Sequence, residues 1–287
     1  MRIHLLDGTY ELYRSHFGAP PRQAPDGREI GATVGVIQST LALLREPEVT
    51  HLAVATDHVI ESFRNDLFVG YKTGAGVPPE LMAQFTLVED ALRALGVVVW
   101  PLVGFEADDG LATAAHRWKG EAQVYILSPD KDLMQCVDGD RVVTFNRRDQ
   151  KRYDAAGVFE KFGVEPASIP DYLALVGDTA DGVPGIPGWG AKSASLLLAR
   201  YGTLEQIPSS HTSWDVAVRG AARLSESLEE CRPEARLYKT LTTLRRDVPL
   251  EESLEDLRWR GVRAPEYLDL CDRLGLNDLR DRPHRWA

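Results

Sequence analysis

Acidic residues recur in this sequence where carboxylates could share one site. Glu106, Asp108 and Asp109 fall within four residues, directly after the apolar run 97–105. The following stretch, 110–115, predicts a helix whose first turn holds the acids, with Glu106 and Asp109 on one face and Asp108 about 100° away. The helix dipole favours negative charge there by only a few tenths to about 1 kcal/mol, which does not call for three acids. An ordinary acidic first turn is the alternative for this stretch taken alone.

More acids follow other predicted strands. The short apolar runs 3–6 and 52–55 lead to Asp7 and Asp57, and a third run, 123–127, leads to Asp130 and Asp132. Strands that alternate with helices of about 10–15 residues predict a mostly parallel sheet with helices on both faces. Because ligands collect outside the carboxyl ends of such strands, we expect these acids to line one edge of the sheet.

The elements that must position these acids are predicted from hydrophobic spacing. Apolar residues three and four apart indicate helices, and short apolar runs indicate strands. The segment 58–80 combines aromatic, basic, glycine and proline residues, which predicts a mobile, partly basic excursion rather than core. The remaining predicted elements of this half are helices over 30–44 and roughly 80–95 and strands over 97–100 and 141–145.

Beyond residue 150 the pattern becomes helical. A helix over 169–176 ends at Gly177-Asp178-Thr179-Ala180-Asp181-Gly182, and the Pro/Gly-rich run 183–192 leads to a second helix over 193–201. A hairpin of this kind presents a row of backbone amides at a helix start, which suits an anion, and Lys192 adds positive charge. A simple connector is the alternative interpretation. Residues 215–287 predict charged helices and indicate no chemistry.

Composition constrains the class of protein and its compartment. The 287 residues include 33 basic and 43 acidic side chains, and the resulting charge of −10 usually argues against nucleic acid. That argument weakens if nine acids serve one site, because 34 acids then face 33 bases. Three cysteines without CxxC spacing predict free thiols in a reducing cytoplasm. The sequence has neither a start that resembles a signal peptide nor a run of about 18 apolar residues. We therefore expect a soluble intracellular protein.

The chemistry of clustered carboxylates is that of hard cations. Oxygen ligands with few basic partners suit Mg²⁺ or Mn²⁺. Two such ions about 4 Å apart would clamp the attacking and leaving oxygens of a phosphodiester, and one would lower the pKa of a bound water. Zinc is disfavoured because the seven histidines are scattered and none forms an HxxxH pair. His58, beside Asp57, is interpreted as a surface or loop residue.

Five motifs, in this order and at these spacings, resemble the 5′-nuclease (flap endonuclease) superfamily. They are MRIHLLDGTYELYR, FRNDLFVGYK, GFEADD, DKD and GDTADGVPGIPGWGAKSA. The resemblance covers almost the whole chain and is nearest to the bacterial 5′–3′ exonucleases and the 5′-nuclease domain of bacterial DNA polymerase I. No polymerase-like segment follows, so we expect a stand-alone enzyme.

The resemblance implies a fold and a metal site. The fold is a PIN-like α/β nuclease core over 1–165, with an arch or gateway at about 58–80, followed by a helical DNA-binding region over 166–287 with a helix-hairpin-helix at about 170–201. The cofactor is Mg²⁺ or Mn²⁺ in two or more ions, and relatives hold a K⁺ at the hairpin. One metal group matches Asp7, Asp57, Glu106 and Asp108, and the other matches Asp109, Asp130, Asp132, Asp178 and Asp181, although the division between the ions is not readable.

Further residues match positions that handle the substrate. Tyr71 and Lys72 match gateway residues, which in the family stack on a base and contact the scissile phosphate. Arg64 is assigned to DNA binding, together with the hairpin residues. Those hairpin residues are Gly185, Gly188, Gly190 and Lys192.

Two positions depart from the family pattern. The family's basic residue three positions after the lysine is Ala75 here, and its asparagine after the second acid of GDxxD is Gly182. Both departures leave the metal site whole. They affect instead the binding of substrate and the rate of cleavage.

The resemblance implies a structure-specific 5′ nuclease, acting as exonuclease, flap endonuclease or both in primer removal and DNA repair. Its expected partner is nicked, flapped or 5′-ended duplex DNA, with RNA-primed DNA left open, and we expect a cytoplasmic monomer that works at the nucleoid without a membrane. A DNA-structure-binding protein with a dead site is disfavoured because nine acids are intact. The hairpin makes a PIN-like ribonuclease less suitable. A phosphatase would need a second acid where Thr9 stands.

Overall fold

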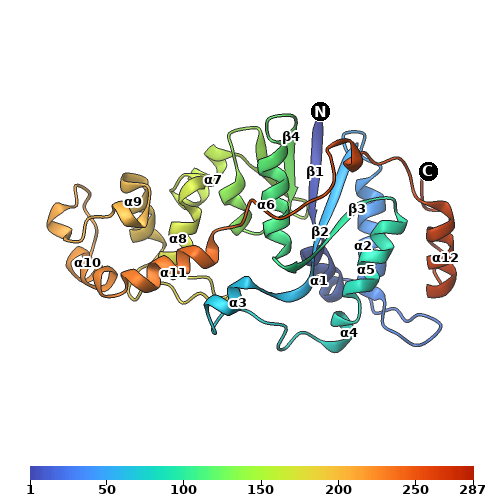
Figure 1. The fold of residues 1–287 in the computed structure, drawn as a ribbon, viewed down its shortest axis with the longest axis horizontal. Coiled ribbons are helices and arrows are strands. Elements are labelled where there is room, and N and C mark those ends of the chain that lie inside the picture. The colour runs from blue at the N-terminus through green and yellow to red at the C-terminus, as the bar shows by residue number, and fades with distance from the viewer. The chain divides into compact units, whose positions relative to one another are not determined.

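The computed structural model describes residues 1–287, which divide into two compact units (Figure 1). The first unit contains residues 1–60, 74–128 and 246–287, and the second contains 61–73 and 129–245. Each unit is therefore assembled from segments far apart in the sequence. The boundary expected at residue 165 stays a prediction. No helix in the protein is long and apolar enough to cross a membrane.

Neighbouring strands in the order β3-β2-β1-β4 form the centre of the first unit. β1 (Arg2–Asp7) pairs in parallel with β2 (His51–Ser62) and with β4 (Gln123–Leu127), and β3 (Val98–Gly104) lies beyond β2. The apolar runs of β1 and of the first half of β2 are buried without alternation, as expected for strands covered on both faces. The predicted strands at 3–6 and 123–127 are thus present.

The strand order places helices on opposite faces of this sheet. The chain runs from β1 to β2 through α1 and α2, and from β2 to β3 through α3 (Phe63–Leu67), α4 and α5. It then returns through α6 to β4, on the other side of β1. Because such crossovers are right-handed, α6 lies on the face opposite α2 and α5. Accordingly, α2 packs on α5 and α6 packs on β1, β3 and β4. The bounds are α1 (Gly8–Gly18), α2 (Gly31–Leu43), α4 (Pro79–Met82), α5 (Phe85–Ala94), α6 (Ala107–Trp118) and, near the C-terminus, α12 (Ala264–Leu274).

Three predicted bounds in this unit are wrong. β2 does not end at Asp57 but continues to Ser62. The end was misplaced because this extension is mostly half-buried or exposed and so lacks the apolar run that marks the first half of the strand. The helix expected at 80–95 is two helices separated at Gln84, whose buried side chain accepts hydrogen bonds from the backbone N–H and the hydroxyl of Thr33. β3 extends past Pro101, which is tolerated because β3 ends the strand order and lies at a sheet edge.

The second unit is mainly helical. Its two strands, β5 and β6, pair antiparallel, and β6 has no counterpart among the predicted elements. Figure 1 shows α8, α9 and α11 side by side, and α8 packs on both of the others. The bounds are α3 (Phe63–Leu67), β5 (Val142–Asn146), β6 (Lys151–Tyr153), α7 (Ala155–Phe162), α8 (Ile169–Val176), α9 (Ala191–Tyr201), α10 (Ala221–Glu230) and α11 (Arg232–Thr242).

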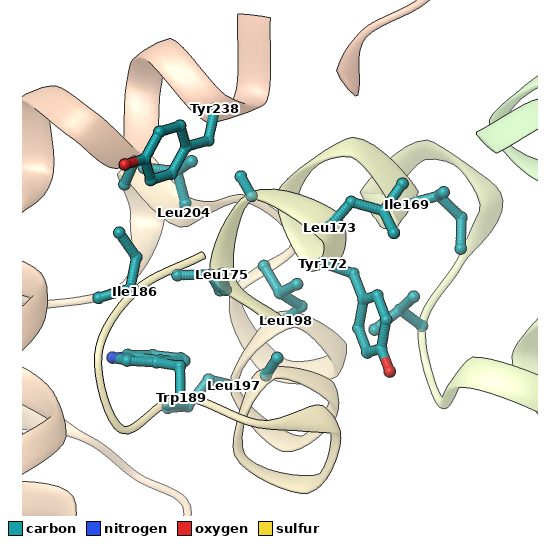
Figure 2. Packing of buried hydrophobic residues seen from close by; sticks show 14 of the residues in the cluster. Ile169, Tyr172, Leu173, Leu175, Ile186, Trp189, Leu197, Leu198, Leu204 and Tyr238 are labelled. Atoms are coloured by element: carbon teal, nitrogen blue, oxygen red, sulfur yellow. The ribbon is translucent and has the colours of Figure 1, made fainter. Parts of the chain in front are cut away.

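The core of the second unit includes the hairpin between α8 and α9. Figure 2 shows the hairpin side chains Ile186 and Trp189 turned toward Leu175 of α8 and Leu197 of α9, and all four are buried. The backbone N–H of Ile186 also donates to the carbonyl oxygen of Leu175, at 2.9 Å. Burial of such side chains stabilises by about 1.5–3 kcal/mol each. The hairpin is therefore a packed part of the unit rather than a simple connector.

Candidate active site

Asp7 is fixed at the junction of three elements. It is the last residue of β1 and the N-cap of α1, where its Oδ1 accepts a hydrogen bond from the backbone N–H of Tyr10 at 2.8 Å. Its Oδ2 accepts from the hydroxyl of Ser128, the residue after β4, at 2.8 Å. The connection after β1 leads to β2, on one side of β1, and the connection after β4 leads away from β1 on the other side. The carboxyl ends of β1 and β4 therefore form a topological switch point, which is where α/β sheets usually bind ligands.

Asp57 is held by the neighbouring connections. The parallel register pairs Asp7 with Ala55, and side chains two residues apart share a face, so Asp57 and Asp7 project from the same face of the sheet. The backbone N–H of Asp57 donates to the hydroxyl of Thr9 at 2.8 Å, and its Oδ1 accepts from the backbone N–H of Ala107 at 2.6 Å. The carboxylate therefore caps the start of α6, near the acids of that helix.

The acids of the first turn of α6 differ in their surroundings. Glu106 is buried at the N-cap position, and Asp108 is half-buried. Asp109 is 0% exposed, and its Oδ2 accepts the backbone N–H of Glu106 at 3.0 Å. One oxygen of Asp109 thus completes a helix cap. The ordinary explanation of an acidic first turn applies to that oxygen, while the proposed ligand role of Asp109 stays a prediction.

The second unit contains a separate group of carboxylates. One oxygen from each of Asp132, Asp178 and Asp181 lies within 4.8 Å of the others. Asp178 is fixed by two backbone hydrogen bonds to Val183, each 2.8 Å long, and the side chain of Asp130 accepts the backbone N–H of Asp132 at 2.8 Å. The sequence motifs DKD and GDTAD are thus brought together by the fold. The expectation that all the acids share one edge concerns both units and stays a prediction.

Asp132 is the most informative member of this group. Its side chain is buried, and its Oδ1 has no hydrogen-bond partner. Burial, reinforced by the negative charges of Asp130, Asp181 and Asp178, raises the pKa of Asp132 well above its usual range. A buried carboxylate oxygen without a donor is costly unless a cation approaches it. The all-oxygen donor set and this open oxygen fit a divalent metal ion.

Lys131 supplies positive charge to the same carboxylates. Its Nζ lies 2.5 Å from Oδ2 of Asp178 and 3.8 Å from Oδ1 of Asp132. Although burial alone would lower it, the pKa of Lys131 is raised by Asp132 and Asp178. Lys131 was not among the predicted site residues, although its place between the two acids of the DKD motif was a usable signal. Thr9 and Ser128, which orient Asp57 and Asp7, had no such signal.

The gateway residues Tyr71 and Lys72 contact an acid of this group. Lys72 Nζ lies 2.9 Å from Oδ1 of Asp181, and the Lys72 backbone N–H donates to the Asp181 carbonyl at 3.0 Å. The Tyr71 hydroxyl donates to Oδ2 of Asp181 at 3.4 Å, and its side chain is buried. The segment that contains these residues was expected to be a mobile excursion outside the core, and for Tyr71 that expectation is wrong. The roles of both residues toward substrate stay predictions.

Gly182 allows this close approach of the two segments. Its φ is +77°, and a β-carbon there would stand 2.2 Å from the carbonyl oxygen of Gly70. An asparagine, the residue found in the family, would therefore force the gateway segment away from residues 181–182. The departure at Gly182 thus has a local steric reason in this chain.

Arg64 has a structural role that runs against its assignment to DNA binding. The side chain is 1% exposed, and its Nε donates to the carbonyl oxygen of Leu241 at 2.7 Å. A second donor, Nη2, reaches the carbonyl oxygen of Thr243 at 3.3 Å. The guanidinium therefore satisfies carbonyls at the C-terminal end of α11, which otherwise lack partners.

The hairpin residues are placed by backbone geometry. Gly185 and Gly188 have φ values of +74° and +82°, and a β-carbon on Gly185 would stand 2.6 Å from the backbone nitrogen of Gly177. Gly190 is the N-cap of α9, which begins at Ala191 rather than at residue 193. Lys192 therefore lies in the first helical turn, and it is exposed. A lysine there gains nothing from the helix dipole, so an external anion is a better partner. Its DNA contact stays a prediction.

Two family models match adjacent parts of the chain. Residues 2–163 match the 5′–3′ exonuclease, N-terminal resolvase-like domain. Residues 164–265 match the 5′–3′ exonuclease, C-terminal SAM fold. Together they account for both the strand-containing half and the helical half of the sequence.

Individual proteins are similar over nearly the whole chain. A 5′–3′ exonuclease of Aquifex aeolicus is 33% identical, over 95% of this chain and 90% of that protein. DNA polymerase I of Bacillus caldotenax is 34% identical over 98% of this chain, which spans about a third of the length of that relative (32%). Among solved structures, the flap endonuclease of bacteriophage T5, in a pseudo-enzyme–product complex with DNA and metal ions, is 17% identical with a TM-score of 0.66. That alignment covers 98% of this chain and 96% of that one. The predicted fold class, a mostly parallel α/β core followed by a helical region, is confirmed.

Proposed function

This chain belongs to the 5′–3′ exonuclease family, and we propose that it is a structure-specific 5′ nuclease that hydrolyses DNA phosphodiesters with divalent metal ions. Its substrates are flapped, nicked or 5′-ended duplexes, as arise in primer removal and repair, and RNA-primed DNA is a further substrate to test. The metal is Mg²⁺ or Mn²⁺, in two or more ions, and K⁺ occupies the hairpin. The enzyme acts as a monomer.

One observation carries this proposal more than any other. The buried Asp132 keeps a carboxylate oxygen without a donor, among carboxylates whose oxygens lie within 4.8 Å of one another. A structural role would leave that oxygen hydrogen-bonded, whereas a cation-binding role requires it to be open. The chain belongs to a family of exonucleases, and Lys72 and Lys131 lie beside these carboxylates. Both facts favour hydrolysis of a phosphodiester over storage of metal ions.

The residues have separate tasks in the proposed reaction. Asp7, Asp57, Glu106, Asp108 and Asp109 would hold metal in the first unit, as Asp130, Asp132, Asp178 and Asp181 would in the second. When bound, the metal supplies a Lewis acid for the phosphate oxygens and lowers the pKa of a bound water. Lys72 would hold the scissile phosphate by a charge-assisted hydrogen bond. Tyr71 would stack on a base only after its ring, 3% exposed here, moves out of the core. The hairpin glycines and Lys192 bind the duplex backbone.

Cleavage is expected to depend strictly on a divalent metal. The ligands are carboxylates, so Mg²⁺ or Mn²⁺ should restore activity after chelation, whereas no histidine or cysteine is needed. The test incubates labelled flap, nicked and single-stranded DNA with either metal or with excess chelator, and product lengths are read. Full cleavage of the flap in excess chelator would contradict the proposal. So would the absence of any cleavage in both metals.

Lys192→Ala is expected to weaken duplex binding without moving the cleavage position. Loss of one phosphate contact should reduce the slope of log Kd against log salt by about 1. The measurement is a salt titration of binding to an uncleaved duplex in chelator. A matched control is Lys161→Ala, which removes an exposed lysine of α7 in the same unit. An unchanged slope in Lys192→Ala would exclude this lysine from the DNA interface.

A further inference from the structure

The start of α10 is attached to the hairpin between α8 and α9. The indole N–H of Trp189, in the hairpin, donates to the carbonyl oxygen of Leu224 at 3.2 Å. The hydroxyl of Ser227, one turn along α10, donates to the carbonyl oxygen of Pro187 at 2.7 Å. Both bonds join side chains to backbone, and Trp189 and Leu224 are buried in the same core. The backbone of the first turn of α10 therefore lies beside the hairpin.

Arg223 uses this position to lie against the hairpin turn. A β-carbon on Gly188 would stand 3.7 Å from Nη2, 3.8 Å from Nε and 3.9 Å from Cζ of Arg223. These distances place the guanidinium beside the turn, at about the separation that a side chain on residue 188 would fill. The missing side chain of Gly188 leaves the space beside the guanidinium open.

The guanidinium of Arg223 is exposed and has no acidic partner. No carboxylate lies within 4 Å of it, and it donates no hydrogen bond within the protein. Two other arginines of this unit are neutralised: Arg200 pairs with Asp215, and Arg232 pairs with Glu229. Glu226, Glu229 and Glu230 follow on the same helix, yet Arg223 pairs with none of them. A cation placed on an anion-binding hairpin without a counter-ion is suited to an external anion.

We infer that Arg223 is a DNA-backbone contact that extends the hairpin interface onto α10. Its planar guanidinium, beside the turn at Gly188, donates to a phosphate of the duplex that the hairpin binds. The planar donors of a guanidinium are pre-organised, so less rotamer freedom is lost per hydrogen bond than for a lysine. This inference rests on the proposed function, since it assumes that the hairpin binds duplex DNA.

The test compares Arg223→Ala with Arg236→Ala on one uncleaved duplex in chelator. Arg236 is an exposed arginine of α11 that also lacks an acidic partner, so its removal changes the net charge equally. For Arg223→Ala we expect a five- to tenfold weaker Kd at moderate salt, and a salt slope reduced by about 0.9. For Arg236→Ala we expect less than a twofold change and the wild-type slope. Arg223→Lys should restore the slope while recovering only part of the affinity, because an ammonium lacks the planar donors.

The outcomes separate this inference from the proposed function. Far-UV circular dichroism and Tm of Arg223→Ala, measured without DNA, should match those of the wild type, because the exposed side chain makes no hydrogen bond within the protein and its loss leaves the fold intact. If the wild-type protein neither binds nor cuts, the proposed function fails. If the wild type binds and cuts but Arg223→Ala keeps the wild-type slope, Arg223 is not a contact, and only this inference is overturned. Equal losses in Arg223→Ala and Arg236→Ala would likewise overturn it, because the effect would be one of net charge.

Discussion

Asp7→Asn is expected to lower the single-turnover rate of flap cleavage by about 10³-fold or more, with binding of uncleaved duplex unchanged or tighter. The substitution removes a proposed metal ligand, and metal-ion catalysis contributes several kcal/mol of transition-state stabilisation, which corresponds to factors of this size. It also removes one negative charge that repels phosphate. The measurements are single-turnover cleavage in Mg²⁺ and duplex binding in chelator.

The fold should tolerate this change, so the loss can be assigned to chemistry. Asparagine is as good an N-cap as aspartate, and its oxygen can still accept the Tyr10 N–H. The Ser128 hydroxyl can turn to accept from the new amide. Asp154→Asn is the matched control, because Asp154 is the N-cap of α7, where its Oδ1 accepts the Gly157 N–H at 2.9 Å. That control should cut at the wild-type rate. Wild-type activity in Asp7→Asn would show that Asp7 serves only as a cap.

The parts of the fold that were predictable are those set by local pattern. The buried runs of β1 and β4 and the helices α2 and α8 follow from hydrophobic spacing, and they lie within about two residues of expectation. The errors arise where tertiary context decides. β2 continues beyond its apolar run, and the break between α4 and α5 centres on Gln84, which is buried because Thr33 supplies its partners. No local signal in the sequence carries that information.

In the candidate site too, some features could be predicted from local sequence pattern and others depend on tertiary packing. Residue types and motifs marked the acids, and the structure places Asp132, Asp178 and Asp181 together although 46 positions separate the first two. The supporting contacts were not predictable. Arg64 belongs to a motif of the family, but its burial against the end of α11 follows from packing alone. The reason for Gly182 likewise appears only when Gly70 is seen to lie against it.

Lys72→Ala is expected to lower single-turnover cleavage by about 100-fold, with little change in the binding of uncleaved duplex. A charge-assisted hydrogen bond to a phosphate contributes about 1.5–3 kcal/mol, which corresponds to roughly 10- to 150-fold in rate. Relatives place a second cation three positions later, where this chain has Ala75, and Lys72 is the one basic residue between positions 65 and 83. No neighbour in this stretch can share its task. Lys161→Ala, which removes an exposed lysine of α7, should cut normally.

The pairing of Lys72 with Asp181 allows a second measurement that separates phosphate binding from metal binding. The two charged groups lie 2.9 Å apart, so Lys72 competes with any cation for Asp181. Lys72→Ala should therefore lower the Mg²⁺ concentration that gives the half-maximal rate, even as the maximal rate falls. A variant that merely disturbed the metal site would show the opposite, a higher metal requirement with a rate rescued at saturating Mg²⁺. A wild-type maximal rate in Lys72→Ala would mean that this lysine neutralises Asp181 in the metal-free protein and takes no part in holding the scissile phosphate.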